Sequence, residues 1–273
     1  MLSVRFNSSS QLVQDQNMDF SEKVVLITGA TSGIGAETAK HFAKHNAKLA
    51  LTGRNPQGLE DVFQACKANG SPDVILMRGD VTNKAFVNSI ISETIKHFGK
   101  LDVLVNNAGI LEIGSIETTN MDQFDRMMNV NVRSVYHLTH LAVPHLIKTQ
   151  GAIVNVSSLV GLRAFPGVLS YCMNKAAIDQ FTRCVALELA SKNVRVNAVN
   201  PGVIVSNLHK RAGIDGKDYE ALLERSKGNH PLGRPGTVDE VAKSILFLAS
   251  EQSSFITAAT LPIDGGKQAA CPR

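Results

Sequence analysis

The chain has 273 residues, of which 44% are hydrophobic and 19% are charged. This composition is typical of globular proteins and excludes a disordered or fibrous chain. The net charge of +4 is modest, and Lys and Arg are spread along the sequence, which argues against a nucleic-acid partner. No apolar stretch is long enough to cross a bilayer, so we expect no membrane partner either.

The four cysteines are far apart in the sequence, at Cys66, Cys172, Cys184 and Cys271. Their spacing matches no zinc or redox motif, which predicts reduced thiols and a cytoplasmic location. The first 17 residues are polar and rich in Ser. This composition is typical of a disordered tail, or of a segment that precedes a start codon at Met18. A weak presequence, with a mitochondrial location, is the alternative. We therefore expect a flexible extension over 1–22, one domain over 23–267 and a tail over 268–273.

Short β-branched apolar runs alternate with longer segments of helical periodicity from Lys23 onward. Such alternation predicts an α/β protein, with a parallel sheet covered by helices on both faces. No change of composition or internal repeat interrupts it, which favours a single domain. The predicted strands cover residues 24–28, 49–52, 74–78, 103–106, 152–157, 195–200 and 260–263. The predicted helices cover 34–45, 57–68, 84–98, 121–149, 171–191 and 238–250.

A long segment, 201–236, follows the sixth predicted strand and is expected to be irregular. Long loops in compact domains are usually lids or binding loops, although a surface insertion is the alternative. Ligands of parallel sheets bind at the carboxyl ends of strands, where this loop begins. Its basic group His209, Lys210 and Arg211 fits either an anionic substrate or a solvated surface.

A glycine-rich turn joins the first strand to the first helix. Its glycines, Gly29, Gly33 and Gly35, fit a tight turn, a close approach of backbone to pyrophosphate and close packing of helix on sheet. The helix N-terminus that follows favours an anion. Because the motif lies between a strand and a helix, it predicts a dinucleotide site.

Three further strand ends bear on this site. Arg54 follows the second strand where no acid is present, which favours the 2′-phosphate of NADP, with a solvated loop arginine as the alternative. Asp80 follows the third strand and fits either an adenine contact or, with Thr82, a helix cap. Residues 106–109 are Asn-Asn-Ala-Gly. Their small side chains would let the backbone pass close to a flat ligand; alternatively, the asparagines form hydrogen bonds that tie neighbouring strands together.

Several polar residues are candidates for the chemistry. Tyr171 and Lys175 are four residues apart on a predicted helix and share one face, where an ammonium would lower the pKa of the phenol. Ser158 follows the fifth strand and fits either a hydrogen bond to a substrate oxygen or ordinary turn chemistry. Asn129 and Asn131 interrupt an apolar helical run, so at least one is expected to have a hydrogen-bonding task.

Together these residues resemble the short-chain dehydrogenase/reductase family. The shared motifs are the glycine turn at 28–35, Asn-Asn-Ala-Gly at 106–109, Asn-Val-Asn at 129–131, Ser158, the Tyr171 to Lys175 spacing and Pro201-Gly202. The resemblance covers residues 23 to about 267. It implies a single-domain Rossmann fold, a doubly wound parallel sheet of about seven strands with helices on both faces, and a substrate loop at about 203–235.

The resemblance also implies residue roles. Tyr171 would exchange a proton with the substrate while hydride moves to or from nicotinamide C4. Lys175 would lower the pKa of Tyr171 and bind the nicotinamide ribose. Ser158 would orient the substrate oxygen, and Asn131 would hold a water. The residues that would bind the cofactor are Gly29, Ser32, Gly33, Ile34, Gly35, Arg54, Asp80, Val81, Asn107, Ala108, Gly109, Tyr171, Lys175, Pro201, Gly202, Ile204 and Ser206. No metal is expected.

The expected activity is that of an oxidoreductase acting on CH–OH donors. Arg54 favours NADP(H), with NAD(H) as the alternative, because Thr31 and Ser32 stand where many NADP users of the family have a basic residue. The branch most resembled is that of 3-oxoacyl-acyl-carrier-protein reductases, which suggests a 3-oxoacyl, steroid or other lipophilic ketone. An NAD-dependent alcohol or hydroxysteroid dehydrogenase, or a cofactor-binding protein without catalysis, is the alternative.

A homo-oligomer, tetramer or dimer, is expected from the apolar faces of the two longest predicted helices. The residues cited for these faces are Leu138, Leu141, Val143, Leu146, Phe181, Val185, Leu187 and Leu189. More apolar faces than one subunit's core requires indicate burial against another subunit. The nearby His137, His140 and His145 have no carboxylate or thiolate beside them in the sequence and are expected at an interface or the surface.

Overall fold

The computed structural model describes residues 18–270. Its strands are β1 (Val24–Thr28), β2 (Lys48–Gly53), β3 (Val74–Arg78), β4 (Val103–Asn106), β5 (Ala152–Val156), β6 (Arg195–Pro201) and β7 (Thr260–Ile263). Its α-helices are α1 (Gly33–Lys44), α2 (Pro56–Ala68), α3 (Lys84–Phe98), α4 (Met121–Met128), α5 (Ser134–Thr149), α6 (Leu169–Leu189), α7 (Leu208–Arg211), α8 (Gly216–Asn229) and α9 (Val238–Ala249). No helix within this range has both the length and the apolar character needed to cross a membrane.

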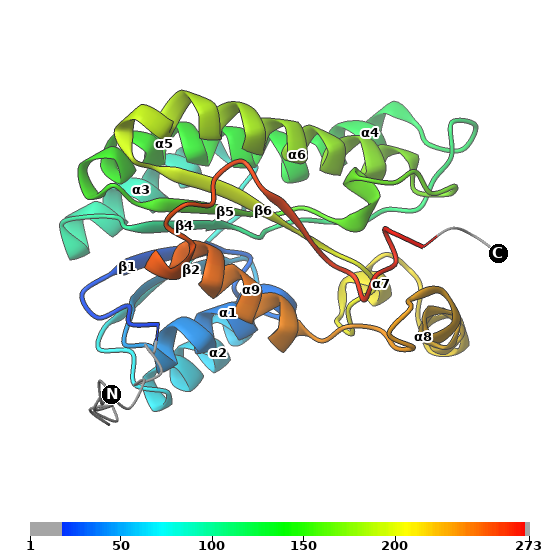
Figure 1. The fold of residues 1–273 in the computed structure, drawn as a ribbon, viewed down its shortest axis with the longest axis horizontal. Helices are drawn as coiled ribbons and strands as arrows, with labels where there is room; N and C mark the ends of the chain where they lie inside the picture. The colour runs from blue at the N-terminus through cyan, green and yellow to red at the C-terminus, as the bar shows by residue number, and fades with distance from the viewer. Residues whose placement is uncertain (1–17, 271–273) are drawn as a thin grey trace, which may run out of the picture.

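The seven strands form one parallel sheet in the order β3-β2-β1-β4-β5-β6-β7. Helices α1, α2 and α9 cover one face, and α3, α5 and α6 cover the other (Figure 1). Strand β1 shows how the sequence serves both layers: Val25 and Ile27 face the first group of helices, and Val24 and Leu26 face the second. The arrangement confirms the predicted Rossmann-type fold, and its strand order reverses between β1 and β4, where ligands of such sheets bind.

Two predicted segments differ from the structure. The predicted helix over 121–149 is interrupted by a π-helical turn, η1 (Asn129–Arg133). The segment 201–236 is not irregular throughout, because it contains α7 and α8, beyond the carboxyl ends of the strands (Figure 1). Helix α8 was missed because its sequence is mostly polar and begins with Gly216, so it lacks a strong apolar stripe.

Both predicted domain boundaries need correction where the structure describes them. Phe20 is only 3% exposed and packs edge-on against Phe42, with ring centroids 4.8 Å apart, so the packed chain begins before Lys23. The Gln268 N–H donates to Asp264 Oδ2 at 2.6 Å, so the predicted tail over 268–273 starts inside the folded region. Residues 1–17 and 271–273, on which the rest of these predictions falls, lie outside the described residues.

The apolar residues predicted for a subunit interface differ in exposure, and three of them, Leu141, Val143 and Val185, are partly buried against the core. Leu138, Leu146 and Leu189 are buried in the core of their own chain, so they carry no argument for an interface. Leu187 is 74% exposed, and Tyr136 on α5, whose ring lies 5.8 Å from that of Phe181, is 62% exposed. The exposed part of the apolar surface is therefore smaller than the sequence suggested.

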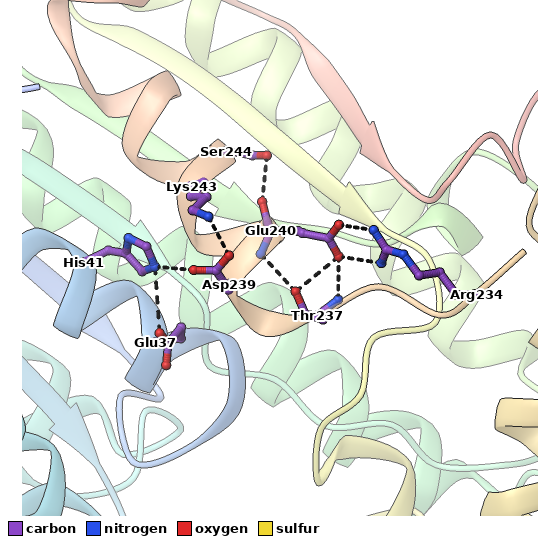
Figure 2. Close-up of polar contacts among 8 residues, drawn as sticks. All are labelled: Glu37, His41, Arg234, Thr237, Asp239, Glu240, Lys243 and Ser244. Carbon is purple, nitrogen blue, oxygen red and sulfur yellow. Dashed lines mark hydrogen bonds and ion pairs between the residues drawn. The ribbon is translucent and has the colours of Figure 1, made fainter. Parts of the chain in front are cut away.

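Helix α9 is anchored at its N-terminus by a polar cluster (Figure 2). Thr237 caps the helix in a capping box with Glu240, and Arg234 pairs with the same Glu240 carboxylate at 2.6 Å. Asp239 accepts a 2.8 Å hydrogen bond from His41 on α1. These contacts fix α9 against α1 and set the point at which the chain leaves the 201–236 segment.

The same cluster brings together three side chains with metal-binding atoms, Glu37, His41 and Asp239. Both carboxylates already have cationic partners, since Lys40 pairs with Glu37 at 3.1 Å and Lys243 pairs with Asp239 at 2.7 Å. His41 therefore joins two helices whose acidic groups are balanced. The cluster is explained by helix packing without an ion.

We expect Thr237→Ala to lower the free energy of unfolding by about 1 kcal/mol, because the substitution leaves the first turn of α9 without its side-chain acceptor. For a chain of this size, that loss corresponds to a decrease in Tm of about 2–4 °C. Thr237→Ser keeps the oxygen and is the matched control. An unchanged Tm in the alanine variant, measured by thermal unfolding, would show that the capping box does not stabilise the fold.

Candidate active site

The glycine turn after β1 is packed directly against the turn after β4. Gly29 has φ +65°, and a Cβ there would lie 2.8 Å from Ala108 Cα. A Cβ on Gly35 would collide with Asn107 Nδ2 and with the Gly29 carbonyl. Two of the three motif glycines are thus required by close packing of two backbone turns and of α1 against them.

Hydrogen bonds hold the same two turns together. Thr28 Oγ1 accepts from the N–H groups of Asn107 and Ala108, both at 3.0 Å, and Asn107 Nδ2 donates to the Thr28 carbonyl at 2.8 Å. Asn106 Nδ2 donates to Asn155 Oδ1 on the neighbouring strand at 2.8 Å. The asparagines therefore tie strands together, which leaves the backbone of Ala108 and Gly109 at the carboxyl ends of the strands.

The N-terminus of α1 has the properties of an anion site. Its N-cap residue is Ser32, whose side chain makes no capping bond, and its first turn contains no acidic residue. Gly33 has φ +58°, and the space beside it is open: a Cβ on Gly33 would have only Ser206 Cβ within 4 Å, at 3.7 Å. Unpartnered N–H groups and the helix dipole both favour a phosphate here, so the residues present fit a dinucleotide pyrophosphate.

Arg54 and Asp80 face each other at the ends of β2 and β3. The Arg54 side chain is 69% exposed, and its Nη1 lies 3.5 Å from Asp80 Oδ2. Partial burial raises the pKa of Asp80, but hydrogen bonds from Thr82 and the proximity of Arg54 outweigh this and hold it below its usual value. Asp80 and Thr82 do not cap α3, as one prediction had it, because Asn83 accepts from the Phe86 N–H. Val81 lies half-buried beside them.

Tyr171 and Lys175 are buried one turn apart on α6. Tyr171 is 8% exposed and Lys175 is 5% exposed, and Lys175 Nζ lies 5.5 Å from the centre of the tyrosine ring. The ammonium donates to the Val156 carbonyl at 2.8 Å. The shared helix face expected from the spacing is therefore present, inside the protein at the end of β5.

The expected lowering of the Tyr171 pKa by Lys175 is absent from the protein on its own. Burial raises the pKa of Tyr171 to about 12, against a smaller lowering effect of its hydrogen bond with Ser158. Burial also lowers the pKa of Lys175 to about 8, although Asp179 favours its charge. Loss of hydration therefore sets the direction of the pKa shift of both groups.

Ser158 is positioned by residues that the sequence analysis did not single out. Its backbone carbonyl accepts from Asn200 Nδ2 at 2.9 Å, and the same Nδ2 contacts both oxygens of Asp179 at 3.0 and 3.1 Å. Its hydroxyl accepts weakly from the Val160 N–H at 3.4 Å. The sequence did contain a signal for them: Asp179 lies among the apolar residues of a predicted helix and Asn200 lies in an apolar predicted strand. Buried polar groups of this kind need hydrogen-bond partners.

Asn131 lies in the π-helical turn and is 1% exposed. Its amide exchanges two hydrogen bonds with Ile110, at 2.8 and 2.9 Å, and Nδ2 also contacts Asn174 Oδ1 at 3.1 Å. A Cβ on Gly109 would lie 3.3 Å from Asn131 Oδ1 and 3.8 Å from Lys175 Nζ. Asn131 therefore holds the chain after β4 beside the buried lysine.

The segment after β6 returns over the buried Tyr171. Pro201 ends β6, and Gly202 would meet His230 Nε2 at 2.9 Å if it carried a Cβ. Ile204 is buried and forms a bridge with Gly236, which closes the base of the loop. Beyond it, Leu208 and Ala212 pack on a cluster formed by Leu111, Met127 and Tyr171, so the loop covers the tyrosine.

Comparisons with known proteins agree with this arrangement. Residues 29–268 match the family model described as Enoyl-(Acyl carrier protein) reductase. The 3-oxoacyl-acyl-carrier-protein reductase of Thermotoga maritima is 38% identical over 251 residues, which is 91% of this chain and 99% of that protein.

Two solved structures extend the comparison. A short-chain dehydrogenase/reductase from Caenorhabditis elegans, solved with cofactor, has a TM-score of 0.87 at 36% identity over 92% of this chain and 97% of its own. A 3-ketoacyl-(acyl-carrier-protein) reductase from Brucella melitensis, solved with NADH, has a TM-score of 0.84 at 32% identity over 92% of this chain and all of its own.

Proposed function

The chain belongs to the short-chain dehydrogenase/reductase family of NAD(P)-dependent oxidoreductases, and on this premise we propose that it reduces a carbonyl group with NADPH, using Tyr171 as the general acid. One observation carries the proposal: Ser158, Tyr171 and Lys175 lie close together beside the Gly109 backbone. They lie at the strand ends, where ligands of such sheets bind. The reverse reaction is oxidation of a secondary alcohol.

Each polar residue has a role that its position supports. Ser158 donates to the substrate oxygen, Tyr171 gives that oxygen its proton, and Lys175 supplies positive charge beneath the ring and binds the nicotinamide ribose. Asn131 orders a water between the buried lysine and solvent. The nicotinamide, when bound, supplies the hydride. Because burial raises the pKa of Tyr171 to about 12, the phenol is protonated at neutral pH and has a proton to give to the substrate oxygen.

The proposed cofactor site uses the ends of β2, β3, β4 and β6 and the N-terminus of α1. The pyrophosphate binds at the N-terminus of α1, against Gly29, Gly33, Ile34 and Gly35. The adenine lies beside Asp80 and Val81, and the dinucleotide crosses the backbone of Asn107, Ala108 and Gly109. The nicotinamide lies beside Pro201, Gly202, Ile204 and Ser206. Arg54 binds the 2′-phosphate, to which its exposed guanidinium has access.

We expect Arg54→Ala to weaken NADPH binding about tenfold and to leave NADH binding unchanged, because only NADPH carries the 2′-phosphate. Arg54→Lys, which keeps the charge without the planar pair of donors, should lose less. The measurement is the dissociation constant of each nucleotide by fluorescence. Equal effects on both nucleotides would reject this assignment of Arg54.

The second candidate is an NAD-dependent alcohol or hydroxysteroid dehydrogenase. Two observations favour it: Asp80 lies 3.5 Å from Arg54 and would repel a 2′-phosphate, and Ser32 is neutral where a second basic residue would help NADP. A cofactor-binding protein without catalysis is disfavoured by the intact set of reacting residues. Titration of the wild-type protein with NADPH and NADH, followed by a panel of 3-oxoacyl thioesters and steroid ketones, separates the three functions.

The setting of the site supports further proposals. We propose one catalytic domain with a substrate loop at about 203–235, in a homotetramer or dimer joined through α5 and α6, where Tyr136 and Leu187 are exposed. The substrate is a small lipophilic ketone. We also propose a cytoplasmic location, in keeping with the free thiols Cys66, Cys172 and Cys184.

A further inference from the structure

Arg211, the last residue of α7, reaches the glycine turn from the other half of the molecule. Its Nη2 donates to Ser32 Oγ at 2.9 Å, although the two residues are 179 positions apart in the sequence. Ser206, at the start of the same loop, lies close to Gly33 of the turn. The substrate loop therefore contacts the N-terminus of α1 at two successive residues.

The packing of the loop sets the position of Arg211. Leu208, the first residue of α7, and Ala212, the residue that follows the helix, pack on the cluster that contains Tyr171. Farther along, the Tyr219 hydroxyl donates to the Ser206 carbonyl at 3.2 Å. Because apolar contacts hold both ends of α7, the guanidinium is placed over the turn by the fold of the loop.

Positive charge at this point has no balancing acid. None of the ion pairs among residues 18–270 includes Arg211, and the first turn of α1 has no acidic residue. A guanidinium and the positive end of a helix dipole thus lie side by side, an arrangement that an anion stabilises. Ser32 uses its oxygen for Arg211 and does not cap its own helix.

We propose that Arg211 binds the pyrophosphate of the dinucleotide and so closes the substrate loop over the bound cofactor. The inference rests on the proposed function and adds a binding residue to it. We assign Arg211 to the pyrophosphate because its partner Ser32 is the N-cap of α1, where the helix dipole favours that group. Ser32 also stands where many NADP users of the family carry a basic residue, so the 2′-phosphate is the alternative that the test separates. A planar guanidinium can pair with phosphate oxygens through two hydrogen bonds.

The test compares three variants of the full chain: Arg211→Ala, Arg211→Lys and Lys210→Ala. Lys210 is the matched control, because it is the adjacent basic residue of α7 but lies over the Tyr219 ring at 4.9 Å. Dissociation constants are measured by fluorescence for NADPH and NADH, and by competition for ADP-ribose. All three ligands carry the pyrophosphate.

We expect Arg211→Ala to weaken all three ligands about tenfold, equivalent to about 1.4 kcal/mol, Arg211→Lys to weaken them less, and Lys210→Ala to leave them unchanged. Wild-type affinity in a folded Arg211→Ala variant would overturn the inference, since the contact would then be a loop latch only. A loss confined to NADPH would also overturn it and assign Arg211 to the 2′-phosphate. If the wild-type protein binds no nucleotide, the proposed function itself fails.

Discussion

Replacing Tyr171 with Phe is expected to lower kcat for carbonyl reduction about a thousandfold, the size of effect expected for loss of a general acid. The affinity for NADPH should stay within about twofold, because the substitution removes one hydroxyl and leaves the buried ring in place. The ring packs with Leu111 and Met127, so the variant should keep its fold. The measurements are steady-state turnover and a fluorescence titration with NADPH.

Tyr136→Phe is the matched control for this substitution. Tyr136 is 62% exposed on α5, so the same loss of a hydroxyl there should leave kcat unchanged. If Tyr171→Phe keeps a tenth or so of wild-type turnover, Tyr171 does not donate the proton. If it instead loses NADPH binding, its hydroxyl serves the cofactor site and the reduced turnover has another cause.

Replacing Lys175 with Met is expected to lower kcat/KM about a hundredfold and to remove a step from the pH profile. Burial lowers the pKa of Lys175 to about 8, so the group is charged at neutral pH and loses its proton as the pH rises through about 8. Wild-type carbonyl reduction should therefore decline above that value. The Met variant has no group to titrate there, and its profile should be flat across this range.

The pH profile separates a chemical role of Lys175 from a structural one. Loss of the hydrogen bond from Lys175 to Val156 could lower activity by disturbing β5, but that effect would not move a titration step. If the decline near pH 8 persists in the Met variant, another group causes it. Thermal unfolding of both proteins shows whether the fold is equally stable at neutral pH.

The fold was predictable because strands and helices of this sequence have distinct local patterns. Strand β1 is a continuous apolar run, typical of a parallel strand buried on both faces, and the structure gives it the predicted bounds. Long-range contacts were not visible to such reasoning. Phe20 belongs to the core because of Phe42, and nothing in its immediate polar neighbourhood indicates that. The π-helical turn at Asn131 likewise goes together with bonds to Ile110, which is 21 residues away in the sequence.

The candidate site was predictable where spacing carries the geometry. The four-residue separation of Tyr171 and Lys175 places both on one helix face whatever the surrounding fold. The direction of the tyrosine pKa was predicted wrongly for the isolated protein, because burial depends on residues distant in sequence. Arg211 and Ser32 come together only through the path of the substrate loop, so the sequence favoured a solvated surface for the basic group over a contact with an anion.

The measurement that tests the proposed chemistry most directly is transfer of deuterium from NADPH labelled at nicotinamide C4, using both stereoisomers of the label. The ketones are those of the panel above, and the products are analysed by mass spectrometry. We predict that one stereoisomer places deuterium on the carbinol carbon, and that Tyr171→Phe makes about a thousandfold less labelled product in the same time. Product without deuterium from either stereoisomer, or bound NADPH that reduces no ketone, would contradict the proposed reduction.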